Sequence, residues 1–166
     1  TCRSSGRCSN AGAAAHDRRF VNQVANLTSS AGPLPNITGQ SITGGAGPAP
    51  IVDAAALGDP LCSAPFAPDT LAGKIVLCER GVNARVDKGA NVLASGAAGM
   101  ILMNDAANGS SLIADAHVLP AVHITYAAGA ALRTWLASGM NHSGTIAGTT
   151  KVVDAAFGDI MASFSS

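Results

Sequence analysis

Histidine is the side chain in this 166-residue chain best suited to acid–base chemistry near neutral pH, and four are present. His16 is followed directly by Asp17, but neighbouring residues on a strand point to opposite faces, so we expect a structural role for this pair. A serine hydrolase needs Ser, His and Asp to converge beside oxyanion donors. No histidine here lies in a context that suggests a catalytic base, and we therefore predict no catalytic residues.

Asp115, His117 and His123 are the set that comes nearest to a metal site, because one carboxylate and two imidazoles are a known combination of ligands. Their spacing does not single out such a site. We expect His117 to fix the loop before Pro120 and His123 to lie on a half-exposed strand. The sequence therefore predicts neither a metal nor any other cofactor.

The cysteines are an even set without a CxxC pair or a histidine at zinc-ligand spacing, so disulfides fit better than metal. They are Cys2, Cys8, Cys62 and Cys78. A bond between Cys62 and Cys78 would remove on the order of 3 kcal/mol of unfolded-state freedom, and we expect it to form. Cys2 and Cys8 either pair with each other or have lost partners outside this sequence. Such bonds predict a secreted, extracellular protein.

The composition excludes several classes of partner. Ten basic and ten acidic side chains leave no net charge to attract nucleic acid or an anionic membrane over a distance. The longest apolar stretches have the length of a strand and fall short of a membrane-spanning helix. Aromatic residues make up only 4% of the chain, so one domain with a core of small aliphatic side chains is expected.

The first predicted segment that positions these residues is an N-terminal arm. Residues 1–48 are interrupted throughout by glycine and proline, although 19–27 alternate at period two and predict a strand. This strand would pair either with the following domain or with sequence outside the chain. Alternation at 144–149 and 151–155 predicts a closing hairpin.

The stronger signals lie between the arm and the hairpin. Strand, helix and strand at 74–79, 83–94 and 99–103 predict a βαβ-like unit, and helical spacing places Val86 and Leu93 on one apolar face together with Ala90. Further strands are expected at 49–53 and 121–125, and a second helix at 126–138. The predicted fold class is α/β: a curled mixed β-sheet, an open barrel-like sandwich, flanked by two or three short helices.

Recognition residues collect in loops on a rigid sheet, so the loops supply the candidate partner contacts. These are Asn83, Arg85, Asn104, Asp105, Asn108, His117 and Leu119.

Long motifs carry a resemblance to a known family. Residues 71–81 (LAGKIVLCERG), 94–104 (ASGAAGMILMN) and 114–120 (ADAHVLP) strongly resemble the protease-associated (PA) domain inserted in subtilisin-like serine proteases, the subtilases of plant and related bacterial type. Residues 15–20 (AHDRRF) resemble the strand that leaves the catalytic domain, and 161–166 (MASFSS) the stretch that returns to it.

The resemblance implies three segments: an N-terminal arm at 1–48 derived in part from the edge of the catalytic domain, a PA domain at 49–156, and a return segment at 157–166. It also implies that the nucleophile lies outside this sequence. The opening around Cys2 and Cys8 departs from the family segment that usually holds the oxyanion asparagine, so Asn10 is not assigned that role. The expected partners are the catalytic domain of a parent protease, polypeptide substrates or a second copy of the chain. The implied function is that of a non-catalytic domain that mediates protein–protein interaction, substrate access or recognition, or dimerisation. A purely structural spacer and a fragment with its own hydrolase activity are the alternatives.

Overall fold

The computed structural model describes residues 18–153, in which eight strands accompany two α-helices and one 3₁₀ helix. Residues 20–150 form one compact unit, while Arg18, Arg19 and residues 151–153 belong to a second. The helices are η1 (Ala54–Leu57), α1 (Arg85–Ala94) and α2 (Tyr126–Leu136). The strands are β1 (Arg18–Thr28), β2 (Ile37–Gln40), β3 (Ala46–Asp53), β4 (Ile75–Glu79), β5 (Gly99–Met103), β6 (Ala121–Ile124), β7 (Ser143–Ile146) and β8 (Thr150–Val153).

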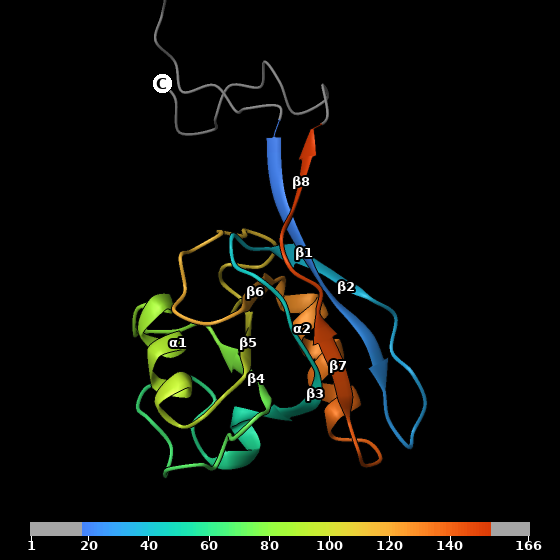
Figure 1. Ribbon diagram of the computed structural model, residues 1–166, viewed down its shortest axis with the longest axis vertical. Helices are drawn as coiled ribbons and strands as arrows, with labels where there is room; N and C mark the ends of the chain where they lie inside the picture. Colours follow the sequence, from blue (N-terminus) through green and yellow to red (C-terminus); the bar gives the residue numbers. More distant parts are fainter. Residues whose placement is uncertain (1–17, 154–166) are drawn as a thin grey trace, which may run out of the picture. The chain divides into compact units, whose positions relative to one another are not determined.

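The strands follow the order β2-β6-β5-β4-β3-β7-β1-β8, and β1 also pairs back with β2 (Figure 1). Strands β3, β4, β5 and β6 pair in parallel, whereas β1 with β2, β1 with β7, β2 with β6 and β3 with β7 pair antiparallel. The predicted α/β fold with a curled mixed sheet and flanking helices is confirmed. The curled sheet closes into a barrel-like ring of seven strands, because β1 pairs with both β7 and β2.

Strand β1 closes the ring because it serves two neighbours in succession. Residues Val21 to Val24 pair with β2, whereas Val24 to Thr28 pair with β7 across a bulge. Asn26 takes up the bulge with a φ of 53°, a left-handed conformation that asparagine tolerates. The strand predicted at 19–27 therefore pairs with the following domain, the first of the two alternatives. The derivation of the 1–48 arm from a catalytic domain stays a prediction.

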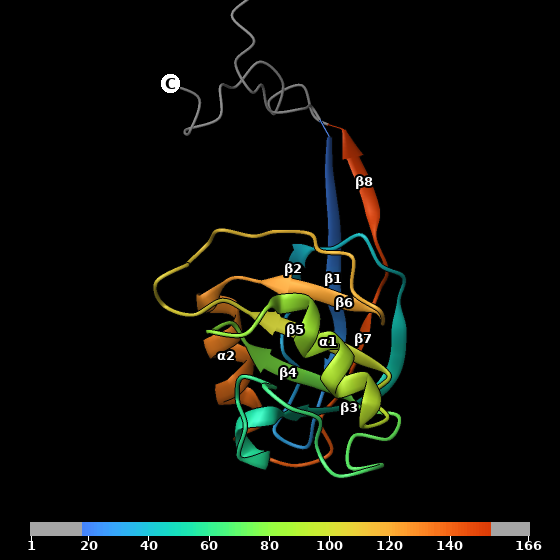
Figure 2. The same ribbon diagram turned by 90° about the vertical axis from the view of Figure 1, so that its left-hand side faces the viewer.

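The parallel strands β4 and β5 form the centre of the core. All of β5 and the first four residues of β4 are buried, as expected for parallel strands covered on both faces. Ile75 and Leu77 pack with Leu132 and Trp135 of α2, while the alternate residue Val76 packs with Val92 of α1. The two helices accordingly lie on opposite sides of β4 and β5 (Figure 1), and α1 crosses in front of them in Figure 2. The βαβ-like unit is confirmed.

Two expectations about elements were wrong. Strands β7 and β8 do not form a hairpin, because β1 lies between them in the sheet. The apolar face of α1 is also reversed: Val86 and Leu93 are exposed, whereas Lys88, Gly89 and Val92 are buried. None of the helices in the described part of the chain is both long and apolar enough to cross a lipid bilayer.

Candidate functional site

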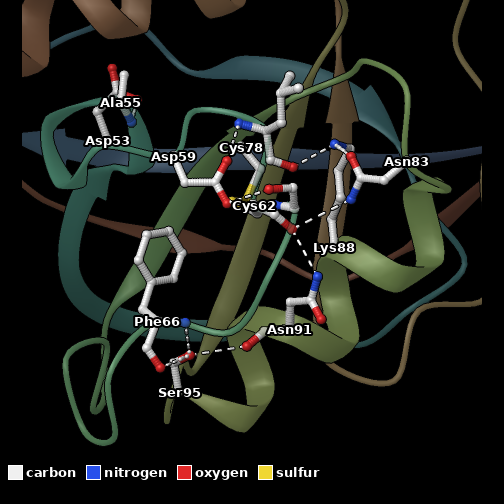
Figure 3. Close-up of a disulfide and its surroundings, with 12 residues drawn as sticks. Asp53, Ala55, Asp59, Cys62, Phe66, Cys78, Asn83, Lys88, Asn91 and Ser95 are labelled. Atoms are coloured by element: carbon white, nitrogen blue, oxygen red, sulfur yellow. Dashed lines mark hydrogen bonds between the residues drawn. A yellow bond between two sulfur atoms is a disulfide. The ribbon is translucent and has the colours of Figure 1, made fainter.

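A disulfide and three polar side chains, two on α1 and one at its C-terminal cap, hold the loop that follows η1. Cys62 and Cys78 form the expected bond, with Cα atoms 5.8 Å apart. Asn91 donates from Nδ2 to the Cys62 carbonyl at 3.0 Å, and Ser95 Oγ accepts from the Phe66 backbone N–H at 2.8 Å (Figure 3). Together with Lys88 these residues recur at the spacing of one helix face. We call residues 59–66, which they hold, the strap.

Lys88 is the least expected member of this group, because its side chain is fully buried at 0% exposure. Its Nζ donates to the Leu61 carbonyl and to Asn83 Oδ1. Burial lowers the pKa of Lys88, although Asp59 and Glu79 act in the opposite direction. Asn83 was predicted to contact a partner, but its amide oxygen is occupied by Lys88, and its Nδ2 lies 3.5 Å from the Cys62 carbonyl. Asn83 therefore supports the strap.

Asn104 holds the long loop between β5 and β6, and its side chain is completely buried. Nδ2 donates to the carbonyls of Gly109 at 3.1 Å and Ser111 at 2.8 Å. Oδ1 lies 2.8 Å from His123 Nε2 and accepts from Arg80 at 3.3 Å. A residue without exposed surface cannot reach a partner, so the contact predicted for Asn104 is replaced by a structural role.

His123 is buried rather than half-exposed as predicted, with 3% of its surface accessible. Its Nδ1 lies 3.0 Å from both the backbone nitrogen and the carbonyl oxygen of Ile113. A neutral ring with the proton on Nε2 satisfies both sides, because Nδ1 accepts from the Ile113 N–H and Nε2 donates to Asn104. Burial lowers the pKa of His123, which keeps the ring in this neutral form.

Asp105 and Asn108 form a local turn beside Asn104. Asp105 Oδ1 accepts from the Asn108 backbone N–H at 2.9 Å and from its side-chain Nδ2 at 2.6 Å. These hydrogen bonds hold the pKa of Asp105 below its ordinary value. Both predicted contact residues are partly accessible, but their side chains are already committed to each other.

Arg85 connects α1 with the end of the same long loop. Its Nε and Nη2 donate to the two oxygens of Asp115 at 2.5 and 3.1 Å, a bidentate ion pair. The hydrogen bond from Arg85 holds the pKa of Asp115 below its usual range. Asp115 is therefore engaged as a carboxylate by Arg85. Among residues 18–153 no group of three or more His, Cys, Asp or Glu side chains could hold a metal ion.

His117 and Leu119 pack on α1 where it carries a glycine. A Cβ on Gly89 would lie 3.0 Å from His117 Nδ1 and 3.1 Å from Leu119 Cδ2. His117 Nδ1 is buried against this position without a hydrogen-bond partner, and burial lowers the pKa of the ring. Leu119 is only 5% exposed. A buried donor without a partner is costly, so the ring is best accommodated with its proton on Nε2.

A groove of about 340 Å³ opens beside these two residues. It is lined by 42–44, from the loop before β3, and by 116–120, from the loop before β6. Ile42 and Val118 are 47% and 65% exposed, so large apolar side chains stand at the groove. We call it the 42–44/116–120 groove. Of the predicted contact residues, it brings together His117 and Leu119, and it leaves out Arg85, Asp105 and the asparagines.

Sequence reasoning missed several residues of this region. Ile42 and Val118 lie in loops and carry no local pattern, so no signal pointed to them. A signal was present for Lys88, Asn91 and Ser95. Polar residues at every third or fourth position of a helix lie on one face and indicate that this face makes its own contacts. Cys2, Cys8, Asn10, His16, Asp17 and the 157–166 segment lie outside the described residues.

The family scan and the curated relatives point to one family. The family model of the PA domain matches residues 48–132. Two subtilisin-like proteases of Arabidopsis thaliana, SBT5.4 and SBT1.7, are 48% and 46% identical to the chain over 99 residues. Those residues are 60% of this chain and 13% of each relative, so the chain spans only a small part of the proteins it matches.

Among solved structures, the zinc aminopeptidase BSAP from Bacillus subtilis is 17% identical to the chain, with a TM-score of 0.47, covering 82% of this chain and 33% of that one. An aminopeptidase from Aneurinibacillus sp. strain AM-1 is 22% identical with a TM-score of 0.44, covering 84% and 33%.

Proposed function

The chain belongs to the PA domain family, and we propose that it is a non-catalytic domain of a secreted subtilisin-like serine protease that recognises polypeptide in the 42–44/116–120 groove. The sequence identity to plant subtilases supports a subtilisin-like protease as the parent protein. The observation that carries the site is the Nε2 atom of His117. This atom makes no hydrogen bond to any described residue, and unlike Nδ1 of the same ring it is not buried. An accessible polar atom beside exposed apolar side chains is what a recognition site requires.

An extended polypeptide fits the chemistry of this groove. The backbone N–H groups of Ala116 and Val118 make no hydrogen bond to any described residue, so they are free to bond a neighbouring chain. His117 Nε2–H can donate to a peptide carbonyl. An apolar side chain of the bound polypeptide would pack between Ile42 and Val118. Binding then requires neither a cofactor nor a covalent step.

The test is binding of β-casein, an unfolded polypeptide, to the purified chain and its variants. We expect V118D and H117A each to weaken binding by about fivefold or more, because they remove the apolar wall and the donor. V82D is the matched control, since Val82 is 96% exposed but lies outside the groove. Equal weakening by V82D, or no weakening by V118D and H117A, would assign recognition to another surface.

The same preparation distinguishes the enzymatic alternative. We expect no cleavage of casein by the pure chain, with or without a chelator. The spacer alternative is tested in the parent protease by deleting the domain. Loss of cleavage of folded proteins with retention of short-peptide cleavage supports recognition, whereas equal loss of both supports a spacer.

A further inference from the structure

Charge is distributed unevenly over the compact unit of residues 20–150. All of its charged side chains lie between Asp53 and Arg133, and residues 20–52 and 134–150 contain no Asp, Glu, Lys or Arg. Charged residues make up about a quarter of an ordinary globular domain. The two uncharged segments are far apart in the sequence but meet in the fold.

The uncharged segments form four neighbouring strands of the ring. Strand β1 pairs with β2 and with β7, and β7 pairs with β3. Their inward side chains, such as Val24, Ile37 and Ile146, belong to the core. We call the outward surface of these strands the uncharged face. Its side chains are either small or polar and neutral: Gln23, Ala25, Asn36, Thr38, Pro48, Pro50, Thr145 and Ala147.

The uncharged face keeps hydrogen-bonding groups available. The side chains of Asn36 and Thr145 make no hydrogen bond to any described residue, and the bond between Gln23 Nε2 and Thr38 Oγ1 is long at 3.4 Å. The centres of protein interfaces are depleted of charged residues, because a charge that loses its water without a partner is costly. A neutral sheet face with free amide and hydroxyl groups has the composition of such a centre.

The polypeptide enters and leaves the unit beside this face. It enters at Phe20 in β1 and leaves at Thr150. Thr150 Oγ1 donates to the Val21 carbonyl at 3.4 Å, so the two points are adjacent. The matched residues are only 13% of each curated relative, so most of such a protein would continue from these two points. A surface next to the point of attachment meets the attached protein at high effective concentration.

We propose that the uncharged face is the docking surface for the remainder of the parent protease, and that the partner surface is also uncharged. A charged partner would lose hydration here without gaining an ion pair. Neutral polar groups of the partner can instead bond to the free amides and hydroxyls. The inference rests on the proposed parent protease. It does not rest on the 42–44/116–120 groove, because no outward side chain of the uncharged face lines that groove.

The test compares thiol labelling of introduced cysteines in the isolated chain and in the complete parent protease, with peptide mass spectrometry to locate the label. We expect T38C and A147C to react at least about tenfold more slowly in the parent protease, because labelling then requires transient opening of the docked surface. A90C is the matched control. Ala90 is exposed on α1, away from β1 and β2 (Figures 1 and 2), and should react equally in both proteins.

An added charge provides the second measurement. Q23E places a carboxylate opposite Thr38 without a change of shape. We expect it to speed the labelling of T38C in the parent protease by at least about threefold, because the docked face would then contain an unpaired charge.

Equal labelling of T38C in the isolated chain and in the parent protease overturns the proposal, as does protection that Q23E leaves unchanged. Protection in the isolated chain that disappears on dilution would assign the face to a second copy of the chain and overturn it as well. V118C distinguishes this inference from the proposed recognition site. It should remain reactive in the parent protease, and its protection alongside T38C would contradict recognition in the groove while supporting docking.

Discussion

Asn104 determines the position of the loop between β5 and β6 through one buried amide. Its Nδ2 is the donor to the Gly109 and Ser111 carbonyls, while its Oδ1 is shared by His123 and Arg80. We expect N104D to lower the free energy of unfolding by about 2 kcal/mol or more, because a carboxylate oxygen would replace the donor and leave buried carbonyls unpaired. Urea denaturation measures the loss. N141D, at an exposed asparagine, should stay within about 0.5 kcal/mol of the parent chain.

His123 makes the stability of the domain depend on pH. Its pKa is lowered by burial, with Arg80, Arg85 and Asp115 as the facing charges. The contribution of this neutral ring is complete above the unfolded-state pKa, about 6.5. It is lost as the pH falls towards the folded-state value, because the unfolded chain takes up the proton first.

We therefore expect the free energy of unfolding to be flat above about pH 7 and to decrease as the pH falls below about 6.5, the ordinary pKa of histidine. His117, whose pKa burial also lowers, adds to the slope in the same direction. H123Q should reduce the slope, since glutamine does not titrate. Urea denaturation across this range measures it, and an unchanged slope in H123Q would show that other groups dominate.

At the scale of single residues, the sequence predicted those features that depend only on residue type. Paired cysteines at 62 and 78 were sufficient to predict a bond, because few other roles suit an even set in such a chain. The burial of Asn104 and His123 could not be predicted, since it depends on a loop that returns across β6. The absence of local periodicity in that loop left no signal.

Glycine lies on the buried face of both α1 and α2, but only the glycine of α2 leaves no room for a side chain. A Cβ at position 89 would meet the ends of the His117 and Leu119 side chains, which can move. At Gly129 of α2, by contrast, a Cβ would lie 2.4 Å from Met103 Cβ, which the strand fixes.

These two glycines form a matched pair, because both are buried and helical. G129A should destabilise the chain by about 2 kcal/mol or more through overpacking. G89A should change stability by less than about 1 kcal/mol, since the gain in helix propensity offsets a small displacement. Its effect should appear instead as changed NMR shifts at His117 and weaker casein binding. A larger loss in G89A than in G129A would contradict this.

Element prediction succeeded where local and tertiary requirements agree. The continuous apolar run of β5 defined its bounds, because a parallel strand covered on both faces needs no alternation. It failed for α1, where the apolar positions Val86 and Leu93 are exposed and the strap occupies the opposite face. Lys88 and Asn91 provide hydrogen-bond donors there, so the strap overrides the apolar pattern.

Across the described domain, the ring of strands and the strap are stabilised differently. Ring closure depends on β1 reaching both β2 and β7, a non-local pairing that no local pattern in residues 1–48 could show. The strap has little regular structure and depends on its links to α1 and β4. Removing the Cys62–Cys78 disulfide therefore tests how the strap is held, while every strand stays in place.

We expect the free energy of unfolding of the double variant C62A/C78A to be about 3 kcal/mol lower than that of the parent. The two cysteines are 16 positions apart in the sequence, and the opened loop regains its freedom in the unfolded state. The Lys88 and Asn91 bonds to the strap should keep the folded state similar, so NMR shifts in β1 and β7 should be unchanged. The single variant C62A also breaks the bond but keeps the buried Cys78 side chain, so the difference between C62A and C62A/C78A measures the volume lost at position 78. If C62A/C78A unfolds at the same urea concentration as the parent chain, the polar face of α1 alone holds the strap, and the disulfide adds nothing to the domain.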